Sequence, residues 1–139
     1  MKKEQQIIKV IMYQVYFNIT DHTWKAVVHY QDELITIDGE EHESDKNRIE
    51  LQSTLEMLQF LRKWIPEPAE FTIFTNSQYT ISCLEKWIPE WIQKGFRIHH
   101  TSKLRPNTDL LVKLHSFDSC MNFSLVQHYN DFEKYNALI

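Results

Sequence analysis

The chain has 139 residues, of which 42% are hydrophobic and 24% are charged, and its formal net charge at neutral pH is −4. This length suits one domain with a buried core, so we expect a single domain over residues 1–139. The net negative charge is unfavourable for nucleic-acid binding. No run of about 18 apolar residues is present to span a membrane. Cytoplasmic localisation without a membrane partner is the default expectation, because the first residues lack the apolar core of a signal peptide.

The charges are distributed unevenly along the chain. Seven of the fourteen residues in the stretch 32–45 are acidic, whereas the stretch 86–105 carries five lysine or arginine residues. Because phosphate binding rests on lysine and arginine, any surface that faces phosphates should involve the second stretch.

The first part of the chain predicts an antiparallel meander of three strands. In residues 7–20, 24–30 and 33–37, β-branched and aromatic side chains alternate with polar ones, which is the pattern of strands joined by tight turns.

A long helix is predicted next, followed by a short buried strand. Ser44 or Asp45 can cap the helix, apolar residues recur at helical spacing as far as Ile65, and Pro66 ends it. Residues 71–75 then form a strand, and the helical crossover makes it parallel to a strand of the meander.

Helices dominate the remainder of the predicted order. The expected elements are a helical stretch at 78–84, a tryptophan-rich helical segment at 87–96, a helix from Asn107 or Thr108, a strand at 122–128 and a short helix at 131–138. The whole pattern predicts an α/β domain with a five-stranded mixed sheet, three antiparallel strands and then parallel strands, flanked by helices.

Several short sequences in this order resemble motifs of the ribonuclease H family. NRIEL at 47–51 is similar to the family's NRxEL, and TNSQY at 75–79 is similar to TDSxY. Residues 87–96 and 107–110 resemble the basic handle and the NxDL of bacterial members, and residues 132–138 resemble the terminal NExADxLA pattern. The resemblance covers nearly the whole chain and implies the ribonuclease H-like fold.

In the family these motifs supply the metal ligands, so the resemblance implies a catalytic site at Asn18, Glu50, Asn76 and Asn136. Asn18 stands where the family has a DGS-type turn. The family has aspartate at three of these positions, where this chain has Asn18, Asn76 and Asn136. Mg²⁺ is held by anionic oxygens, and each charge missing near 4 Å forgoes roughly 4 kcal/mol at an effective dielectric of about 20. We therefore expect no metal or cofactor and little or no nuclease activity.

Other interpretations of the same residues stay open. Asparagine is common in turns and caps, and Glu50 could be an ordinary solvent-facing helix residue. The alternative function is an active, Mg²⁺-dependent endoribonuclease on RNA/DNA hybrids, with Asp21, Asp131 or Glu133 substituting for the missing ligands.

The resemblance to the handle implies a nucleic-acid partner, either RNA/DNA hybrid or duplex RNA. The expected contact residues are Lys94, Arg97, Lys103, Arg105, Trp87, Trp91, Asn47 and Gln78. The tryptophans could instead only pack the handle helix. Because fold does not determine function, a protein-interaction subunit is a further hypothesis, in which the acidic stretch 32–45 attracts a basic protein.

Overall fold

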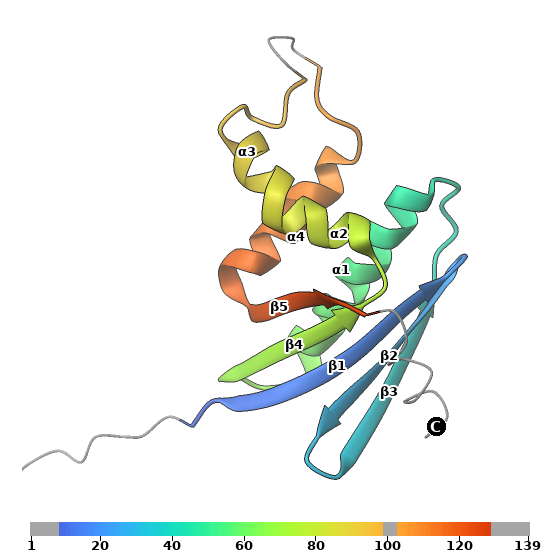
Figure 1. Cartoon of the computed structure of the whole chain (residues 1–139), viewed down its shortest axis with the longest axis vertical. Coiled ribbons are helices and arrows are strands. Elements are labelled where there is room, and N and C mark those ends of the chain that lie inside the picture. The colour runs from blue at the N-terminus through green and yellow to red at the C-terminus, as the bar shows by residue number, and fades with distance from the viewer. Residues whose placement is uncertain (1–8, 99–102, 129–139) are drawn as a thin grey trace, which may run out of the picture.

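The computed structural model describes residues 9–98 and 103–128 and contains one mixed sheet in the order β3-β2-β1-β4-β5 (Figure 1). The strands are β1 (Ile11–Thr20), β2 (Thr23–Tyr30), β3 (Glu33–Glu40), β4 (Ala69–Thr75) and β5 (Asn122–Gln127). β1, β2 and β3 are antiparallel neighbours, whereas β4 runs parallel to both β1 and β5. The fold expected from the sequence, a five-stranded mixed sheet flanked by helices, is confirmed.

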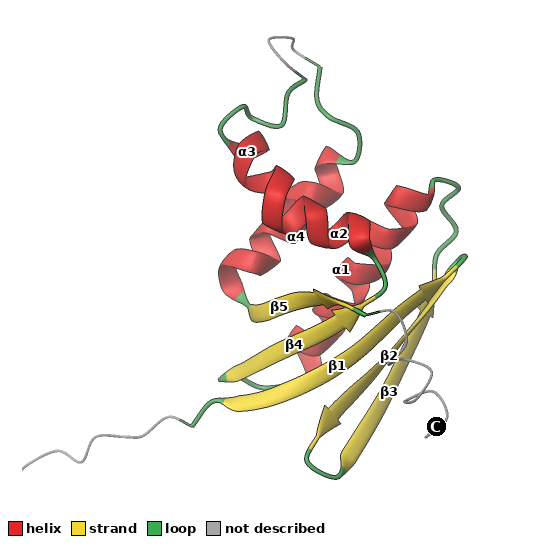
Figure 2. Cartoon of the chain, in the orientation of Figure 1, coloured by secondary structure: helices red, strands yellow, loops and turns green. Residues whose placement is uncertain are grey.

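The helices connect β3 to β4 and β4 to β5 (Figure 2). They are α1 (Lys46–Trp64), α2 (Gln78–Ser82), the π-helical turn η1 (Cys83–Trp87), α3 (Ile88–Ile92) and α4 (Thr108–Cys120). The expected helix at 131–138 lies outside the described residues. No helix in the described part of the chain is long and apolar enough to cross a membrane.

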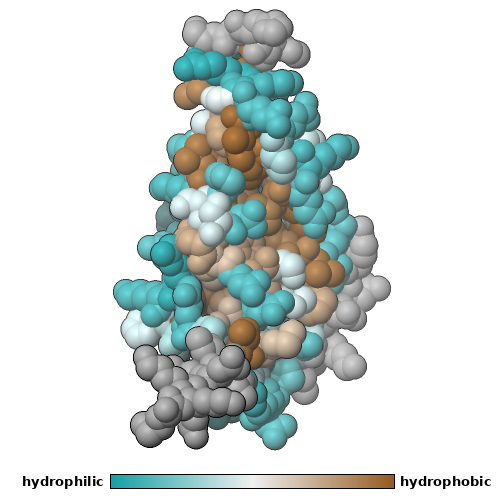
Figure 3. Space-filling view, turned by 90° about the vertical axis from the view of Figure 1, so that its left-hand side faces the viewer, coloured by the Kyte–Doolittle hydropathy of each residue, from teal (hydrophilic) through white to brown (hydrophobic). Residues whose placement is uncertain are grey.

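The core lies between the helices and one face of the sheet. Val15 and Phe17 of β1 point to this face and are fully buried together with Leu58 of α1. Tyr16 points to the opposite face, where it packs with Val27. Side chains alternate along a strand, so odd-numbered residues of β1 face α1 and even-numbered residues face away. On the side of the molecule in Figure 3, apolar residues form a band between polar ones.

Several details differ from the sequence expectation, among them the end of β3 and the cap of α1. β3 continues to Glu40 rather than ending at Ile37. Gly39 permits this continuation, because a Cβ atom there would lie within 2.4 Å of the Trp24 indole, which is far closer than contact distance. Asp45 occupies the cap position of α1, but its side chain makes no capping hydrogen bond.

A bidentate ion pair joins the first turns of α1 and α4. Arg48 Nη2 lies 2.7 Å from Asp109 Oδ2, and Arg48 Nη1 donates to Asp109 Oδ1 at 3.0 Å and to Asn107 Oδ1 at 3.3 Å. The hydrogen bonds from Arg48 hold the pKa of the Asp109 carboxyl below its usual value. The pair therefore fixes the two helices relative to each other.

Replacing Arg48 should lower stability in a pH-dependent way. We expect Arg48→Met to lower the free energy of unfolding at neutral pH by about 1 kcal/mol, because the pair is partly exposed. Asp109 has a lowered pKa in the folded state, so its contribution is present above the unfolded pKa and is lost as pH falls through the folded pKa. Urea denaturation at neutral and acidic pH measures this, with Lys113→Met as the control. An equal loss at both pH values would assign the effect to packing of the arginine stem.

Candidate functional site

A pocket of about 580 Å³ lies between the end of β1 and the start of α1. Its lining residues are Ile19, Asp21, His22, Ser44, Lys46, Ile49, Glu50 and Asn76. The pocket thus brings together two of the predicted site residues, Glu50 and Asn76. Glu50 is half-buried on α1 and faces this pocket, so it is not simply a solvent-facing helix residue.

Both polar atoms of the Asn76 side chain bond to the backbone of β1. Its Oδ1 accepts a hydrogen bond from Ile19 N at 2.9 Å, and its Nδ2 donates to Ile19 O at 2.9 Å. These two bonds continue the parallel pairing of β1 with β4 beyond its last pair, Phe17 and Thr75. An amide is required for this arrangement, because a carboxylate could accept from the N–H group but could not donate to the carbonyl.

Asn18 does not belong to this pocket, so the expectation that it stands beside Glu50 and Asn76 is wrong. Its Nδ2 donates to Thr20 Oγ1 at 3.1 Å, on the sheet face that points away from α1. Strand alternation places the neighbouring Ile19 on the pocket side instead. The apolar series formed by Val15, Phe17 and Ile19 is the sequence signal that could have shown this.

Asn136, the last of the four predicted site positions, lies outside the described residues. The possible substitute ligands Asp131 and Glu133 lie outside them as well. Asp21 is the substitute carboxylate that the described residues place in the pocket. In residues 9–98 and 103–128, no group of three or more His, Cys, Asp or Glu side chains could hold a metal ion.

Sequence reasoning also missed the basic side chains of the pocket. Lys46, the first residue of α1, and His22, in the turn between β1 and β2, both line it. The described lining therefore combines two carboxylates, from Asp21 and Glu50, with the permanent cation of Lys46. The position of Lys46 directly before the NRIEL sequence was the available signal.

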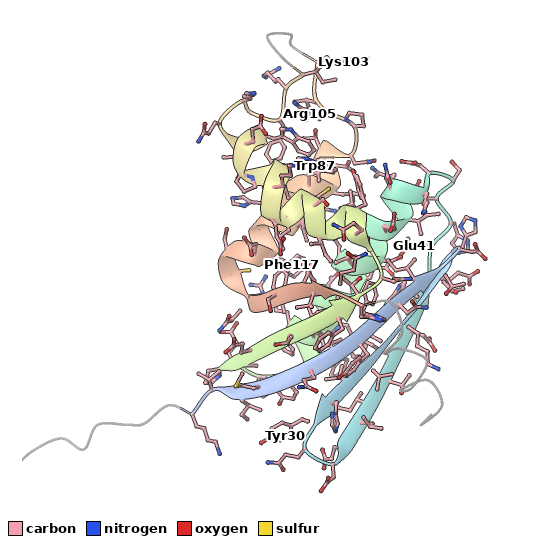
Figure 4. The ribbon with its side chains drawn as sticks, in the orientation of Figure 1. Tyr30, Glu41, Trp87, Lys103, Arg105 and Phe117 are labelled. Carbon is pink, nitrogen blue, oxygen red and sulfur yellow. The ribbon has the colours of Figure 1, made fainter. Side chains whose placement is uncertain are left out.

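An aromatic column forms the second predicted surface. Trp87 stacks on Trp91 with ring centroids 5.6 Å apart, and Tyr79 lies 6.0 Å from Trp87 on its other side. The guanidinium carbon of Arg105 lies 4.5 Å from the centre of the Trp91 ring. Both tryptophans are partly exposed, so they pack the handle and also present ring surface. Figure 4 shows Trp87, Lys103 and Arg105 together at one end of the molecule.

The other predicted handle residues surround this column. Lys94 is exposed and lies 3.5 Å from Glu90, one turn earlier. Arg97 and Lys103 are exposed on two segments that a β-bridge between Arg97 and Leu104 holds together. Of the predicted basic residues, Arg105 contacts the Trp91 ring, and Lys94 N donates to Trp91 O at 3.0 Å.

Asn47 and Gln78 lie at the starts of α1 and α2, outside both the pocket lining and the aromatic column. Both are exposed, and Gln78 Nε2 donates to Ser82 Oγ at 3.1 Å. Ser77 starts α2 as its cap, because its hydroxyl accepts from Thr80 N at 3.2 Å.

Comparisons with known proteins agree with this architecture. The RNase H family model matches residues 16–130. Ribonuclease H of Prochlorococcus marinus (strain NATL1A) is 39% identical over 75 residues, which are 53% of this chain and 46% of that protein. The chain thus spans about half the length of the curated relatives it matches.

Solved structures with the same fold have low sequence identity to this chain. LC9-RNase H1, a type 1 RNase H with the type 2 active-site motif, superposes with a TM-score of 0.73 at 15% identity, over 96% of this chain and 72% of that chain. LC11-RNase H1, solved in complex with RNA/DNA hybrid, superposes with a TM-score of 0.56 at 11% identity, over 87% and 86% of the two chains. Because the family model matches well over half of its residues, the chain belongs to the RNase H family.

Proposed function

We propose that this chain is an RNase H-like domain that binds RNA/DNA hybrid without cleaving it. The observation that carries the proposal is the pocket beside Glu50, where Ile19 is apolar and the amide of Asn76 is occupied by backbone hydrogen bonds. Two-metal hydrolysis needs ions that activate water and stabilise the charge on the phosphate and the leaving oxygen. The described donors do not fit a pair of Mg²⁺ ions, which require several anionic oxygens.

The pocket can still meet a phosphate group. Lys46 supplies a positive charge there, and the imidazole of His22 offers a hydrogen-bonding group beside it. Asp21 and Glu50 balance part of this charge, so we expect a weak contact to a phosphodiester rather than tight anion binding.

The handle supports hybrid as the partner. Lys94, Arg97 and Lys103 are exposed cations of the handle, Arg105 covers the ring of Trp91, and binding of nucleic-acid backbones rests on such cations. LC11-RNase H1, which shares the fold, is solved with an RNA/DNA hybrid, and this likeness supports the same partner class here.

One observation favours active hydrolysis as a second candidate function. Asp21 lines the same pocket as Glu50, so these two carboxylates could share a metal ion with a further ligand outside the described residues. On this candidate function, Asp21→Asn and Glu50→Gln would each abolish cleavage.

A labelled RNA/DNA hybrid incubated with Mg²⁺, Mn²⁺ or EDTA tests the proposal. We expect no cleavage, and binding that weakens with salt, is the same in EDTA and is not weakened by Glu50→Gln. Replacing Lys94, Arg97 and Lys103 with glutamine should lower the affinity about tenfold or more and reduce the salt slope by about 3. Electrophoretic mobility and fluorescence anisotropy provide the measurements.

The matched control removes the same charge elsewhere, with Arg62, Lys63 and Lys113 replaced by glutamine. Its affinity should stay near that of the native chain. Cleavage that disappears in both Asp21→Asn and Glu50→Gln would establish the second candidate function instead. Absence of any salt-sensitive hybrid binding would contradict the proposal and direct attention to a protein partner.

A further inference from the structure

β3 is an edge strand with exposed apolar side chains. It pairs with β2 on one side, and the described part of the chain places no strand on its other side. The side chains of Leu34 and Ile35 are 41% and 51% exposed. Proteins usually protect a sheet edge with a short strand, a proline or a bulge, but β3 is eight residues long and contains no proline.

A groove runs beside this edge, between β3 and the second half of α1. It measures about 310 Å³, and Asp38, Phe60, Lys63 and Trp64 are among its lining residues. Phe60 is 38% exposed and Trp64 is 64% exposed, with ring centroids 6.0 Å apart. The groove therefore offers an aromatic platform directly next to unpaired backbone groups.

The hairpin geometry shows which backbone groups of β3 point outward. Two residues, Gln31 and Asp32, connect β2 to β3, so Tyr30 and Glu33 form the hydrogen-bonded pair nearest the turn. Hydrogen-bonded and non-hydrogen-bonded pairs alternate along an antiparallel ladder. Thr36 consequently falls in the set whose N–H and C=O groups face away from β2.

The charge of the edge selects among the strands that could add to it. Glu33, Asp38 and Glu40 lie on β3, and Lys63 is the basic residue of the groove. Pairing of two copies of β3 through the outward-facing groups, with Thr36 opposite Thr36, would set Asp32 opposite Glu40 at both ends. Like charges directly opposite each other destabilise a strand pair, so this edge suits a basic strand better than a second copy.

We propose that the β3 edge binds an extended, basic segment of another protein by β-strand addition. Main-chain hydrogen bonds to β3 supply the pairing, and alternate apolar side chains of the partner pack against Phe60 and Trp64. Lysine or arginine side chains of the partner meet Asp38 and Glu40, which alternate with the buried Ile37 and so lie on the sheet face away from α1. Tyr30, at the β2–β3 turn, and the handle residues Trp87 and Arg105 lie at opposite ends of the molecule (Figure 4), so the start of β3 lies far from the handle.

The test uses a fluorescent peptide as long as β3 in which lysine alternates with valine, compared with a peptide that carries glutamate at each lysine. We expect the full chain to bind the basic peptide saturably and the acidic peptide at least about tenfold more weakly, with the preference reduced at about 0.5 M salt. Amide shifts in ¹⁵N NMR spectra should concentrate in β3 and at the indole N–H of Trp64.

Thr36→Pro removes an outward-facing N–H group and should weaken peptide binding at least about tenfold, whereas Thr36→Val keeps that group and should bind like the native chain. If Thr36→Pro does not fold, the variant that combines Asp38→Lys and Glu40→Lys serves instead and should abolish the preference for the basic peptide. Equal binding of both peptides, or shifts confined to β5 or the handle, would overturn the proposal. The proposal would also be overturned if the chain formed a homodimer that persists in Thr36→Val and is lost in Thr36→Pro. That result would show that a second copy of this chain occupies the β3 edge.

Discussion

The variant that combines Ile19→Asp, Asn76→Asp and Asn136→Asp is expected to bind Mn²⁺ and to cleave RNA/DNA hybrid. The variant that combines Asn18→Asp with the same changes at Asn76 and Asn136 is expected neither to bind Mn²⁺ nor to cleave the hybrid. The Ile19→Asp change would place a carboxylate in the pocket that already holds Glu50, because Ile19 lines that pocket. The Asn18→Asp change would place it on the opposite face of the sheet, where Asn18 now bonds to Thr20.

The expected gain in metal affinity is large. One carboxylate about 4 Å from a cation contributes roughly 4 kcal/mol at an effective dielectric of about 20, and more for a divalent ion. After repulsion between the clustered carboxylates is subtracted, we expect Mn²⁺ to bind at least about 100-fold more tightly, which corresponds to about 2.7 kcal/mol. Titration calorimetry measures the affinity, and cleavage of a labelled hybrid measures the activity.

The two triple variants carry the same charge and differ only in which of two adjacent residues is replaced. Both lose the hydrogen bond from Asn76 Nδ2 to Ile19 O, so both should be less stable by roughly 1 kcal/mol, which thermal unfolding can verify. Equal Mn²⁺ affinity in the two variants would show that the pocket is not the metal position. If only the triple variant that contains Asn18→Asp bound Mn²⁺ tightly, the sequence-based assignment of Asn18 to the ligand position would be restored.

The difference between Asn18 and Ile19 shows what sequence could predict about the site. The TNSQY motif placed Asn76 correctly at the end of β4, and NRIEL placed Glu50 on the pocket side of α1. The first strand has no such motif, so its register rested on a single asparagine. Period-2 alternation is the stronger physical constraint, because a shift of one residue moves a side chain to the other face of the sheet.

The elements with long periodic patterns were predicted best. α1 repeats its apolar residues at helical spacing and ends just before Pro66, as expected. The segment between β4 and α4 was harder, because η1 is a π-helical turn and Asn107 has a left-handed backbone with φ of 64°. Neither conformation has a hydrophobic period, so the pattern of residues alone does not reveal it.

The handle depends on a contact that spacing cannot predict. Trp87 and Trp91 are four residues apart, and their stacking follows from helical geometry. Arg105 reaches Trp91 because the chain reverses direction after Phe96 and returns, with Arg105 N donating to Phe96 O at 2.7 Å. Sequence indicated the composition of this surface, and the three-dimensional structure supplies its arrangement.

A pair of carboxyl groups joins the end of β3 to α1. Glu41 is only 8% exposed, and its side chain is hydrogen-bonded to Glu56, which also accepts a bond from Trp24 Nε1 at 3.1 Å. Burial raises the pKa of Glu41 to about 7, and the charges of Glu56 and Glu43 add to this effect. Among the residues that the structure describes, Glu41 Oε1 has no hydrogen-bond partner, so its ionised form is poorly compensated.

Stability should therefore fall as pH rises from about 4.5 to about 7. The pKa of Glu41 is higher in the folded than in the unfolded state, so the folded state binds more protons in this range and loses stability as they dissociate. The loss should be at most about 3 kcal/mol. Glu41→Gln keeps a neutral, hydrogen-bonding side chain, so it should raise the free energy of unfolding at alkaline pH and leave it nearly unchanged at acidic pH. Urea denaturation of both proteins at about pH 5 and pH 8 measures this, with the exposed Glu85→Gln as control. A Glu41→Gln curve that keeps the native pH dependence would contradict the assignment.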